Sequence, residues 1–341
     1  MTPRPPIAAA AATTAPAVLD LSDNTNLYGA PPAALRILRE AAPDDATRYP
    51  SAYSDALRAA LARSLGATPD QVTTGCGSDD VLDSAIRTFA APGERIAFCD
   101  PTFSMIPVLA ERNRLVQAPV PFTAGHDLDA EALLATGAPV IYLCSPNNPT
   151  GTAASGEAIA RVLGGASGVV LMDEAYADFA AANVLGEATR RENLLVVRTL
   201  SKAFGLAGMR VGYGVGAPAL IARVETARGP YKVGAAAERA ATGVLTEDLE
   251  WVRERARLAV GDRARLIAAL TVAGLRPLPS AANFVLVPVA DAEACARRML
   301  EAGVAVRAFA GLSGIGDAVR ITVGPEPCGT RAVAALEEAL A

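Results

Sequence analysis

The sequence is short of the residues that zinc sites and disulfide scaffolds need. Its 341 residues include one histidine, His126, and five cysteines that stand singly, with no CxxC pair. A zinc site of the usual Cys and His type therefore has almost no ligands, which disfavours metal catalysis. We interpret the cysteines as reduced core residues of a cytoplasmic protein and His126 as an exposed loop residue.

The sequence also lacks long apolar runs and an excess of positive charge. Nowhere do about 18 apolar residues run uninterrupted, so a membrane span is not supported. The alanine-rich N-terminus is broken by Pro5, Pro6 and Pro16, which favours a frayed arm over a signal peptide. A net charge of -5 argues against a nucleic-acid partner, because phosphate binding needs a basic face.

The hydrophobic pattern predicts an α/β fold with a second, smaller domain. From residue 30 to 235 short apolar runs alternate with helical periodicity, which indicates a largely parallel sheet with crossover helices. We expect strands at 95–99, 140–144, 169–172, 194–198 and 211–215, and helices at 56–65, 80–90 and 155–163. A helical stretch at 236–270 should lead to strands at 282–288, 303–307 and 318–323, with helices at 292–301 and 331–340. The predicted division is an arm at 1–30, a large domain at 31–235 and a small domain at 236–341.

A lysine directly after a predicted strand is the first candidate for chemistry. Lys202 lies in the segment TLSKAFGLAGMR, residues 199–210. A partly desolvated lysine has a lowered pKa and can attack an aldehyde, while Ser201 and Arg210 offer a donor and a charge for a phosphate. An anionic aldehyde cofactor fits both features. A surface turn with a solvated lysine and arginine fits the same residues equally well.

A carboxylate at the end of another strand is the second candidate. Asp173 and Tyr176 belong to DEAY, at the strand edge where ligands of open α/β sheets gather. A carboxylate there can keep a pyridine nitrogen protonated, and Tyr176 can donate a hydrogen bond to a ring oxygen. The alternative is that Asp173 caps the next helix, which is the commoner role of such a residue.

Two turns rich in glycine or proline complete the candidate set. SPNNPTG, residues 145–151, follows a predicted strand and places Asn148 where it can donate to the same ring oxygen. GCGSDD, residues 75–80, opens a helix, and the free N–H groups at a helix start form an anion site. A lone glycine turn is weak evidence for phosphate binding by itself.

Taken in order, SPNNPTG, DEAY and TLSKAFGLAGMR resemble the fold-type I aminotransferases, which use pyridoxal phosphate. The resemblance runs from about residue 24 to 323 and is closest to the histidinol-phosphate aminotransferase branch. It implies a large domain with a mostly parallel seven-stranded sheet between helices, and a smaller α/β C-terminal domain. It also implies a homodimer with shared active sites.

The resemblance gives each motif residue a role toward the cofactor. Lys202 would form the Schiff base and move the proton between the substrate Cα and the cofactor. Asp173 would pair with the pyridine nitrogen, and Asn148 and Tyr176 would bind the ring hydroxyl. The remaining contacts would be a stacking ring from Phe103 and phosphate contacts from Ser78, Asp79, Ser201, Arg210 and the neighbouring subunit's Tyr49.

The substrate residues follow from the same resemblance. Arg320, in VRITVG, would grip an α-carboxylate, and Arg307 would help to bind the distal phosphate of histidinol phosphate. Asn24, Tyr28 and Gly29 align with the segment that covers the site. The sequence departs from the family where substrate is chosen: Thr25 replaces a glutamate, Leu27 a proline, and Lys232 and Gly234 stand where asparagine is common.

Several activities stay open at this point. The first is amino transfer between histidinol phosphate and 2-oxoglutarate in histidine biosynthesis. Others are an aminotransferase for an aromatic or specialised-pathway amino acid, and a threonine-phosphate-type decarboxylase of the same fold. Motifs do not separate these, because the bond that breaks is the one held perpendicular to the cofactor ring. A cofactor-binding regulator is disfavoured by Lys202 and by the lack of a basic extra domain.

Overall fold

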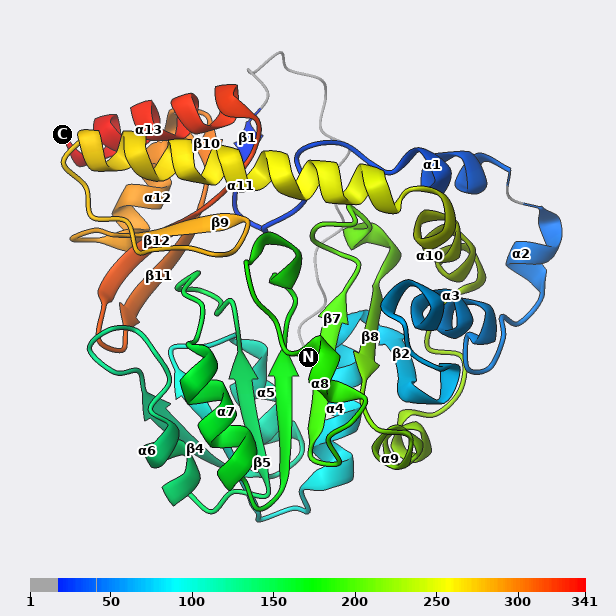
Figure 1. The fold of residues 1–341 in the computed structure, drawn as a ribbon. Coiled ribbons are helices and arrows are strands. Elements are labelled where there is room, and N and C mark those ends of the chain that lie inside the picture. The colour runs from blue at the N-terminus through cyan, green and yellow to red at the C-terminus, as the bar shows by residue number, and fades with distance from the viewer. Residues whose placement is uncertain (1–17, 41) are drawn as a thin grey trace, which may run out of the picture.

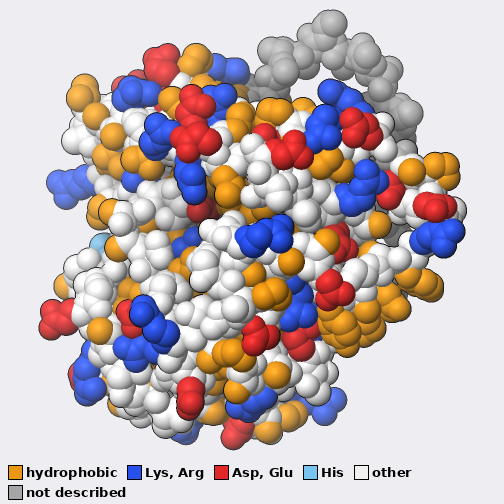
Figure 2. All heavy atoms as spheres, turned by 45° about the vertical axis from the view of Figure 1, so that its right-hand side comes forward, with side chains coloured by type: hydrophobic (Ala, Val, Ile, Leu, Met, Phe, Trp, Pro, Cys, Tyr) orange, Lys and Arg blue, Asp and Glu red, His pale blue; other side chains and the backbone are white. Residues whose placement is uncertain are grey.

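The computed structural model describes residues 18–40 and 42–341. Most of the predicted N-terminal arm, including its alanine run and Pro5, Pro6 and Pro16, lies outside the described residues. Among the helices that are described, none is long and apolar enough to cross a bilayer. Figure 2 shows acidic and basic side chains interspersed over the face in view, as the small net charge of -5 leads us to expect.

A seven-stranded sheet forms the centre of the larger unit (Figure 1). Only β8 runs antiparallel to its neighbours, so the prediction of a mostly parallel sheet is confirmed. The strands, in spatial order, are β2 (Val72–Cys76), β8 (Val211–Val215), β7 (Leu194–Thr199), β6 (Val169–Asp173), β5 (Val140–Cys144), β3 (Arg95–Asp100) and β4 (Val116–Pro121).

Helices cover both faces of this sheet. Along β6, Val170 and Met172 join one hydrophobic cluster, while Val169 and Leu171 join the other. This alternation is that of a strand buried on both faces. One cluster includes α3 (Asp55–Leu65), α7 (Gly156–Gly165) and α10 (Ala235–Glu247), and the other includes α4 (Gly77–Phe89), α5 (Met105–Arg112) and α9 (Pro218–Arg228).

The sequence pattern missed the two edge strands. β2 reads VTTGC and β4 reads VQAPVP, and neither has the continuous apolar run of the buried strands. Proline is tolerated on an edge because the missing N–H faces away from a partner strand. The remaining elements of this unit are α1 (Pro32–Arg39), α2 (Pro43–Thr47), α6 (Ala130–Ala135), α8 (Leu185–Ala188) and three short 3-10 turns (Pro69–Gln71, Ala177–Phe179 and Ala207–Met209).

The predicted helical stretch at 236–270 is two helices that meet at Asp248. α10 packs on α1 and α3 within the large unit, whereas α11 (Leu249–Val272) runs along the top toward the small unit (Figure 1). The Asp248 carboxylate accepts a hydrogen bond from the Ala33 N–H at 2.7 Å. This distant contact stabilises the break between the two helices.

The small unit is a three-stranded antiparallel sheet covered by two helices. Its strands are β11 (Arg307–Leu312), β12 (Gly316–Thr322) and β9 (Phe284–Pro288), and its helices are α12 (Ala292–Glu301) and α13 (Glu326–Leu340). The strand expected at 303–307 is instead β10 (Val304–Ala305), followed by the start of β11. β10 pairs with β1 (Leu19–Asp20), so the described end of the predicted arm joins the small unit.

Candidate active site

One pocket lies at the carboxyl ends of the central strands, against the small unit. β5, β6 and β7 end at Cys144, Asp173 and Thr199, and parallel strands bring such ends to one edge. Most of the predicted residues line this pocket: Asn24, Ser78, Asp79, Phe103, Asn148, Asp173, Tyr176, Ser201, Lys202, Arg210, Arg307 and Arg320. Residues from seven separate stretches of sequence are therefore brought together.

Asp173 is held rigidly at the floor of the pocket. Its side chain is buried; Oδ1 accepts the Ala175 N–H at 3.0 Å, and Oδ2 accepts the Tyr142 hydroxyl at 2.8 Å. Burial raises the pKa of Asp173 to about 6, against the opposing effect of these two hydrogen bonds. The carboxylate is thus ionised at neutral pH and faces the pocket, which favours the ligand-binding interpretation over a helix cap.

Tyr142 is a functional residue that the sequence interpretation missed. It lies in the middle of β5, in VIYLC, and is fully buried. A buried phenol needs a hydrogen-bond partner, so a single tyrosine in an aliphatic strand was the available signal. Its partner is Asp173, 31 residues further along the chain.

Lys202 enters the pocket from the turn after β7. Its Nζ donates to the backbone oxygen of Asp23 at 3.1 Å and lies 5.8 Å from the centre of the Tyr176 ring. Burial, together with the positive charge of Arg320, lowers the pKa of Lys202 from 10.5 to about 8. The amine is therefore partly neutral near physiological pH and can act as a nucleophile or a base.

We expect the reactivity of Lys202 to follow this lowered pKa. In the cofactor-free protein, acetylation of Lys202 by acetic anhydride should rise with pH with a midpoint near 8, because only the neutral amine attacks. Mass spectrometry of the digested protein measures the modified fraction, with Lys232 as the internal reference for reagent decay. A midpoint near 10.5 would mean that the amine is solvated and that the desolvation argument is wrong.

Residues 75–80, which we call the glycine turn, lie beside Arg210, which also approaches Ser201. Gly77 has φ +77, and a Cβ there would lie 2.4 Å from Nη2 of Arg210, so glycine is what lets the guanidinium approach. Nη1 of Arg210 lies 3.4 Å from the Ser201 hydroxyl, and Nη2 lies 3.5 Å from the Asp79 carboxylate. Because that carboxylate faces Arg210, Asp79 can serve an anion only through its backbone N–H at the start of α4.

Arg320 reaches the opposite wall of the pocket from β12. Nη1 donates to the Asn148 amide oxygen at 2.5 Å and Nη2 to the Ser22 backbone oxygen at 2.8 Å. Its buried Nε has no hydrogen-bond partner within residues 18–40 and 42–341. Arg307 is the cross-strand neighbour of Arg320 in the β11–β12 pair. Two guanidinium groups on neighbouring strands can bind an anion with one or two negative charges.

The amide of Asn148 and the hydroxyl of Tyr176 have their orientations fixed. The Asn148 oxygen accepts from Arg320, so its Nδ2 group remains to donate into the pocket. The Tyr176 oxygen accepts from Nδ2 of Asn24 at 3.0 Å, which leaves its own proton to donate. Both groups therefore keep a donor that is available to a ligand.

Comparison with known families identifies the family of this chain. The model of the family "Aminotransferase class I and II" matches residues 16–336. The chain belongs to this family. The histidinol-phosphate aminotransferase 2 of Ralstonia nicotianae is 39% identical over 337 residues, which span 95% of this chain and 89% of the relative. That of Roseiflexus castenholzii is 37% identical over 320 residues, spanning 90% and 85%.

Solved aminotransferase structures share the fold. The histidinol-phosphate aminotransferase of Sinorhizobium meliloti, solved in complex with pyridoxal-5'-phosphate, superposes with a TM-score of 0.83 at 27% identity, covering 95% of this chain and 91% of the other. The aspartate aminotransferase of Thermus thermophilus with maleate has a TM-score of 0.79 at 22% identity, covering 95% and 92%, which shows the common fold alone. The predicted fold class is confirmed.

Two predicted site residues of this aminotransferase lie outside the pocket. The Tyr28 hydroxyl donates to Asp262 of α11 at 2.8 Å, and Tyr28 is not among the residues that line the pocket. Tyr49 is 84% exposed, and its ring lies 5.1 Å from that of Tyr231. Lys232 also lies outside, where its Nζ contacts Asp80 at 2.9 Å.

Proposed function

We propose that this aminotransferase uses pyridoxal phosphate to transfer an amino group between histidinol phosphate and 2-oxoglutarate. One observation carries the proposal. A lysine of lowered pKa and a buried carboxylate lie at neighbouring strand ends, and both face a pocket whose opposite wall holds two arginines. The names of the curated relatives support histidinol phosphate as the donor.

The residues of the pocket fit pyridoxal phosphate group by group. Asp173 offers a carboxylate for the pyridine nitrogen, Asn148 and Tyr176 offer donors for the ring oxygen, and Phe103 offers an apolar face. The glycine turn, Ser201 and Arg210 suit the phosphate. When bound there, the cofactor would supply an electron sink for the bond that breaks at the substrate Cα.

The chain's own residues would bind the substrate and move the proton. Lys202, with a pKa of about 8, would take the proton from Cα and return it, since a group that titrates near the working pH can do both. Arg320 would hold the α-carboxylate of glutamate with its guanidinium group, because this residue lines the pocket. Histidinol phosphate carries a phosphate and no carboxylate, and the second cation, Arg307, suits that dianion.

A prediction about Arg307 follows from these different roles, in which Arg320 binds a carboxylate and Arg307 helps to bind a phosphate. In Arg307→Ala, kcat/KM for histidinol phosphate should fall by about tenfold more than kcat/KM for glutamate, because the second charge matters most to a dianion. Steady-state assays with both donors measure the ratio. Arg297→Ala, which removes another exposed arginine of the small unit, should leave the ratio unchanged. An equal loss for both donors in Arg307→Ala contradicts the proposed phosphate contact.

The substrate itself is tested by mixing the purified holoenzyme separately with candidate donors. Histidinol phosphate, glutamate, phenylalanine and phosphothreonine should be compared by the rate at which the visible absorbance of the lysine-bound cofactor disappears. We expect histidinol phosphate and glutamate to react and the products to be oxo compounds. Carbon dioxide released from phosphothreonine would favour the decarboxylase alternative, and a faster reaction of phenylalanine would favour an aromatic donor.

We also propose a homodimer in which Tyr49 reaches the cofactor phosphate of the neighbouring subunit. Tyr49 and Tyr231 form a tilted aromatic pair with 84% and 50% of their surface exposed. Large exposed aromatic rings are typical of surfaces that a partner covers. A gathering of hydrophobic side chains is visible on the right of the face in Figure 2.

The five free cysteines support the proposed location in the cytoplasm, where thiols are kept reduced.

A further inference from the structure

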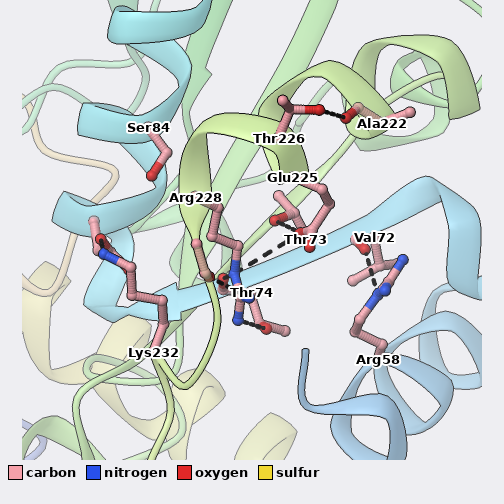
Figure 3. A network of polar contacts seen from close by, with 12 residues as sticks. Arg58, Val72, Thr73, Thr74, Ser84, Ala222, Glu225, Thr226, Arg228 and Lys232 are labelled. Carbon is pink, nitrogen blue, oxygen red and sulfur yellow. Dashed lines mark hydrogen bonds and ion pairs between the residues drawn. The ribbon is translucent and has the colours of Figure 1, made fainter. Parts of the chain in front are cut away.

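The glycine turn is fixed from outside the pocket by the segment that joins α9 to α10. Figure 3 shows Lys232 of this segment, and Arg228 directly before it in the chain direction, extending toward α4 and β2. Arg228 is the last residue of α9, and Lys232 lies three residues before α10. Arg228 contacts Thr74, at the start of residues 74–80, and Lys232 contacts Asp80, at their end.

Arg228 fixes the strand that leads into the turn. Its side chain is buried, Nη2 donates to the Thr74 hydroxyl at 2.9 Å, and Nε donates to the Thr74 backbone oxygen. Two residues earlier, Nε of Arg58 donates to the Val72 oxygen at 2.9 Å. β2 is an edge strand of the described sheet, so every second backbone carbonyl points away from its partner strand and needs a donor from outside the sheet. Arg58 and Arg228 supply these donors at Val72 and Thr74.

Lys232 is connected to the turn itself through one carboxylate. Its Nζ lies 2.9 Å from Oδ1 of Asp80, and Oδ2 of Asp80 accepts the backbone N–H of Cys76 at 3.1 Å. The Asp80 carboxylate packs closely on the turn, because a Cβ at Gly75 would lie 2.9 Å from Oδ2. The ammonium group therefore holds Asp80, and Asp80 holds the backbone of the turn.

The turn needs external support for two reasons. Gly75 and Gly77 have wide conformational freedom in the unfolded and loosely held states, so fixing them costs entropy. In the part of the chain that is described, the start of α4 also has no capping bond from a side chain at Cys76, which leaves its N–H groups for a ligand. A turn fixed in advance binds an anion more tightly than one that must be ordered by it.

We propose that Lys232 is a positioning residue that acts through Asp80 to hold the glycine turn in its phosphate-binding form. This rests on the proposed function, in which that turn binds the cofactor phosphate. Lys232 itself lies outside the pocket, whereas Ser78 and Asp79 of the turn line it. The sequence contains only two lysines, Lys202 and Lys232, among 31 basic residues, so Lys232 can be changed without creating ambiguity about the reactive amine.

The test compares the affinity of the cofactor-free protein for pyridoxal phosphate and for pyridoxal, which lacks the phosphate. We expect Lys232→Met to weaken pyridoxal phosphate binding about tenfold, the size of one lost charge-assisted hydrogen bond, and to leave pyridoxal nearly unchanged. Lys232→Arg should restore most of the affinity. Arg161→Met, which removes another cation from an ion pair, with Glu131 on α6, is the matched control and should change neither affinity.

A double-mutant cycle shows whether Lys232 acts through Asp80. If it does, Lys232→Met combined with Asp80→Asn should bind pyridoxal phosphate no more weakly than Asp80→Asn alone. Amide hydrogen exchange at residues 75–80 should also be faster in Lys232→Met. Additive losses in the cycle, or equal losses for pyridoxal and pyridoxal phosphate, overturn the positioning role.

The two proposals fail in different ways. A wild-type protein that binds pyridoxal as tightly as pyridoxal phosphate has no functional phosphate site, and the proposed function is then wrong. A wild-type protein that prefers pyridoxal phosphate, and a Lys232→Met variant that keeps the full preference, contradict only the role of Lys232.

Discussion

Replacing Lys202 by alanine is expected to lower the rate of amino transfer by at least about a thousandfold. General acid–base catalysis alone contributes about 10²- to 10⁴-fold, and the same residue would also attach the cofactor. The variant should lack the visible absorbance of a lysine-bound cofactor. After borohydride reduction, mass spectrometry should find the cofactor on Lys202 in the wild type and on no residue in the variant.

Lys232→Arg provides the control for this experiment. It leaves Lys202 as the only lysine in the chain, so reduction must still place the cofactor there. Circular dichroism of Lys202→Ala should match the wild type, because the lysine contributes one hydrogen bond, to the Asp23 backbone oxygen. Full turnover and an unchanged cofactor spectrum in Lys202→Ala would falsify the assignment of the reactive amine.

Burial shifts the pKa values of Asp173 and Lys202, the two central titratable groups of the pocket, in opposite directions. It raises the pKa of Asp173 to about 6 and lowers that of Lys202 to about 8, because both groups lose charge stabilisation by water. Between these values the carboxylate is ionised and the amine is close to its titration point. In the proposed function, the same physical effect would prepare Asp173 to hold a proton on the cofactor nitrogen and Lys202 to exchange one with the substrate.

Local sequence was sufficient to predict the core of the fold and most of the pocket. β5 and β8 have the predicted bounds, and β3, β6 and β7 differ from the prediction by one residue. These strands are continuous apolar runs that end at Pro, Gly or polar residues, and their ends carry the motifs. Because parallel strands share one edge, the motif residues that follow them had to meet.

The features that sequence could not predict depend on contacts between distant residues. Tyr142 reaches Asp173, Lys232 reaches Asp80 across 152 positions, and Tyr28 reaches Asp262 across 234. The break at Asp248 depends in the same way on Ala33. No periodicity or motif marks such pairs.

Replacing Arg320 by glutamine is expected to lower kcat/KM for glutamate by about a hundredfold or more. A charge pair desolvated in a pocket is worth about 2–5 kcal/mol when one partner is removed, and Arg320 is 7% exposed. The affinity for pyridoxal phosphate should change by less than about threefold, because Asn148 is the one proposed cofactor residue to which Arg320 donates a hydrogen bond. Steady-state kinetics and equilibrium titration of the cofactor measure the two effects separately.

The choice of substitution decides what this experiment reports. Arg320→Gln can still donate to the Asn148 oxygen and so keep the Asn148 amide oriented, whereas Arg320→Ala leaves that buried oxygen without its donor. We therefore expect kcat/KM for glutamate to fall equally in both variants, and the affinity for the cofactor to fall only in the alanine variant. An equal fall in cofactor affinity in both variants would mean that Arg320 serves the cofactor directly. The α-carboxylate would then need another partner. Arg307 is the first candidate, because it is the cross-strand neighbour of Arg320.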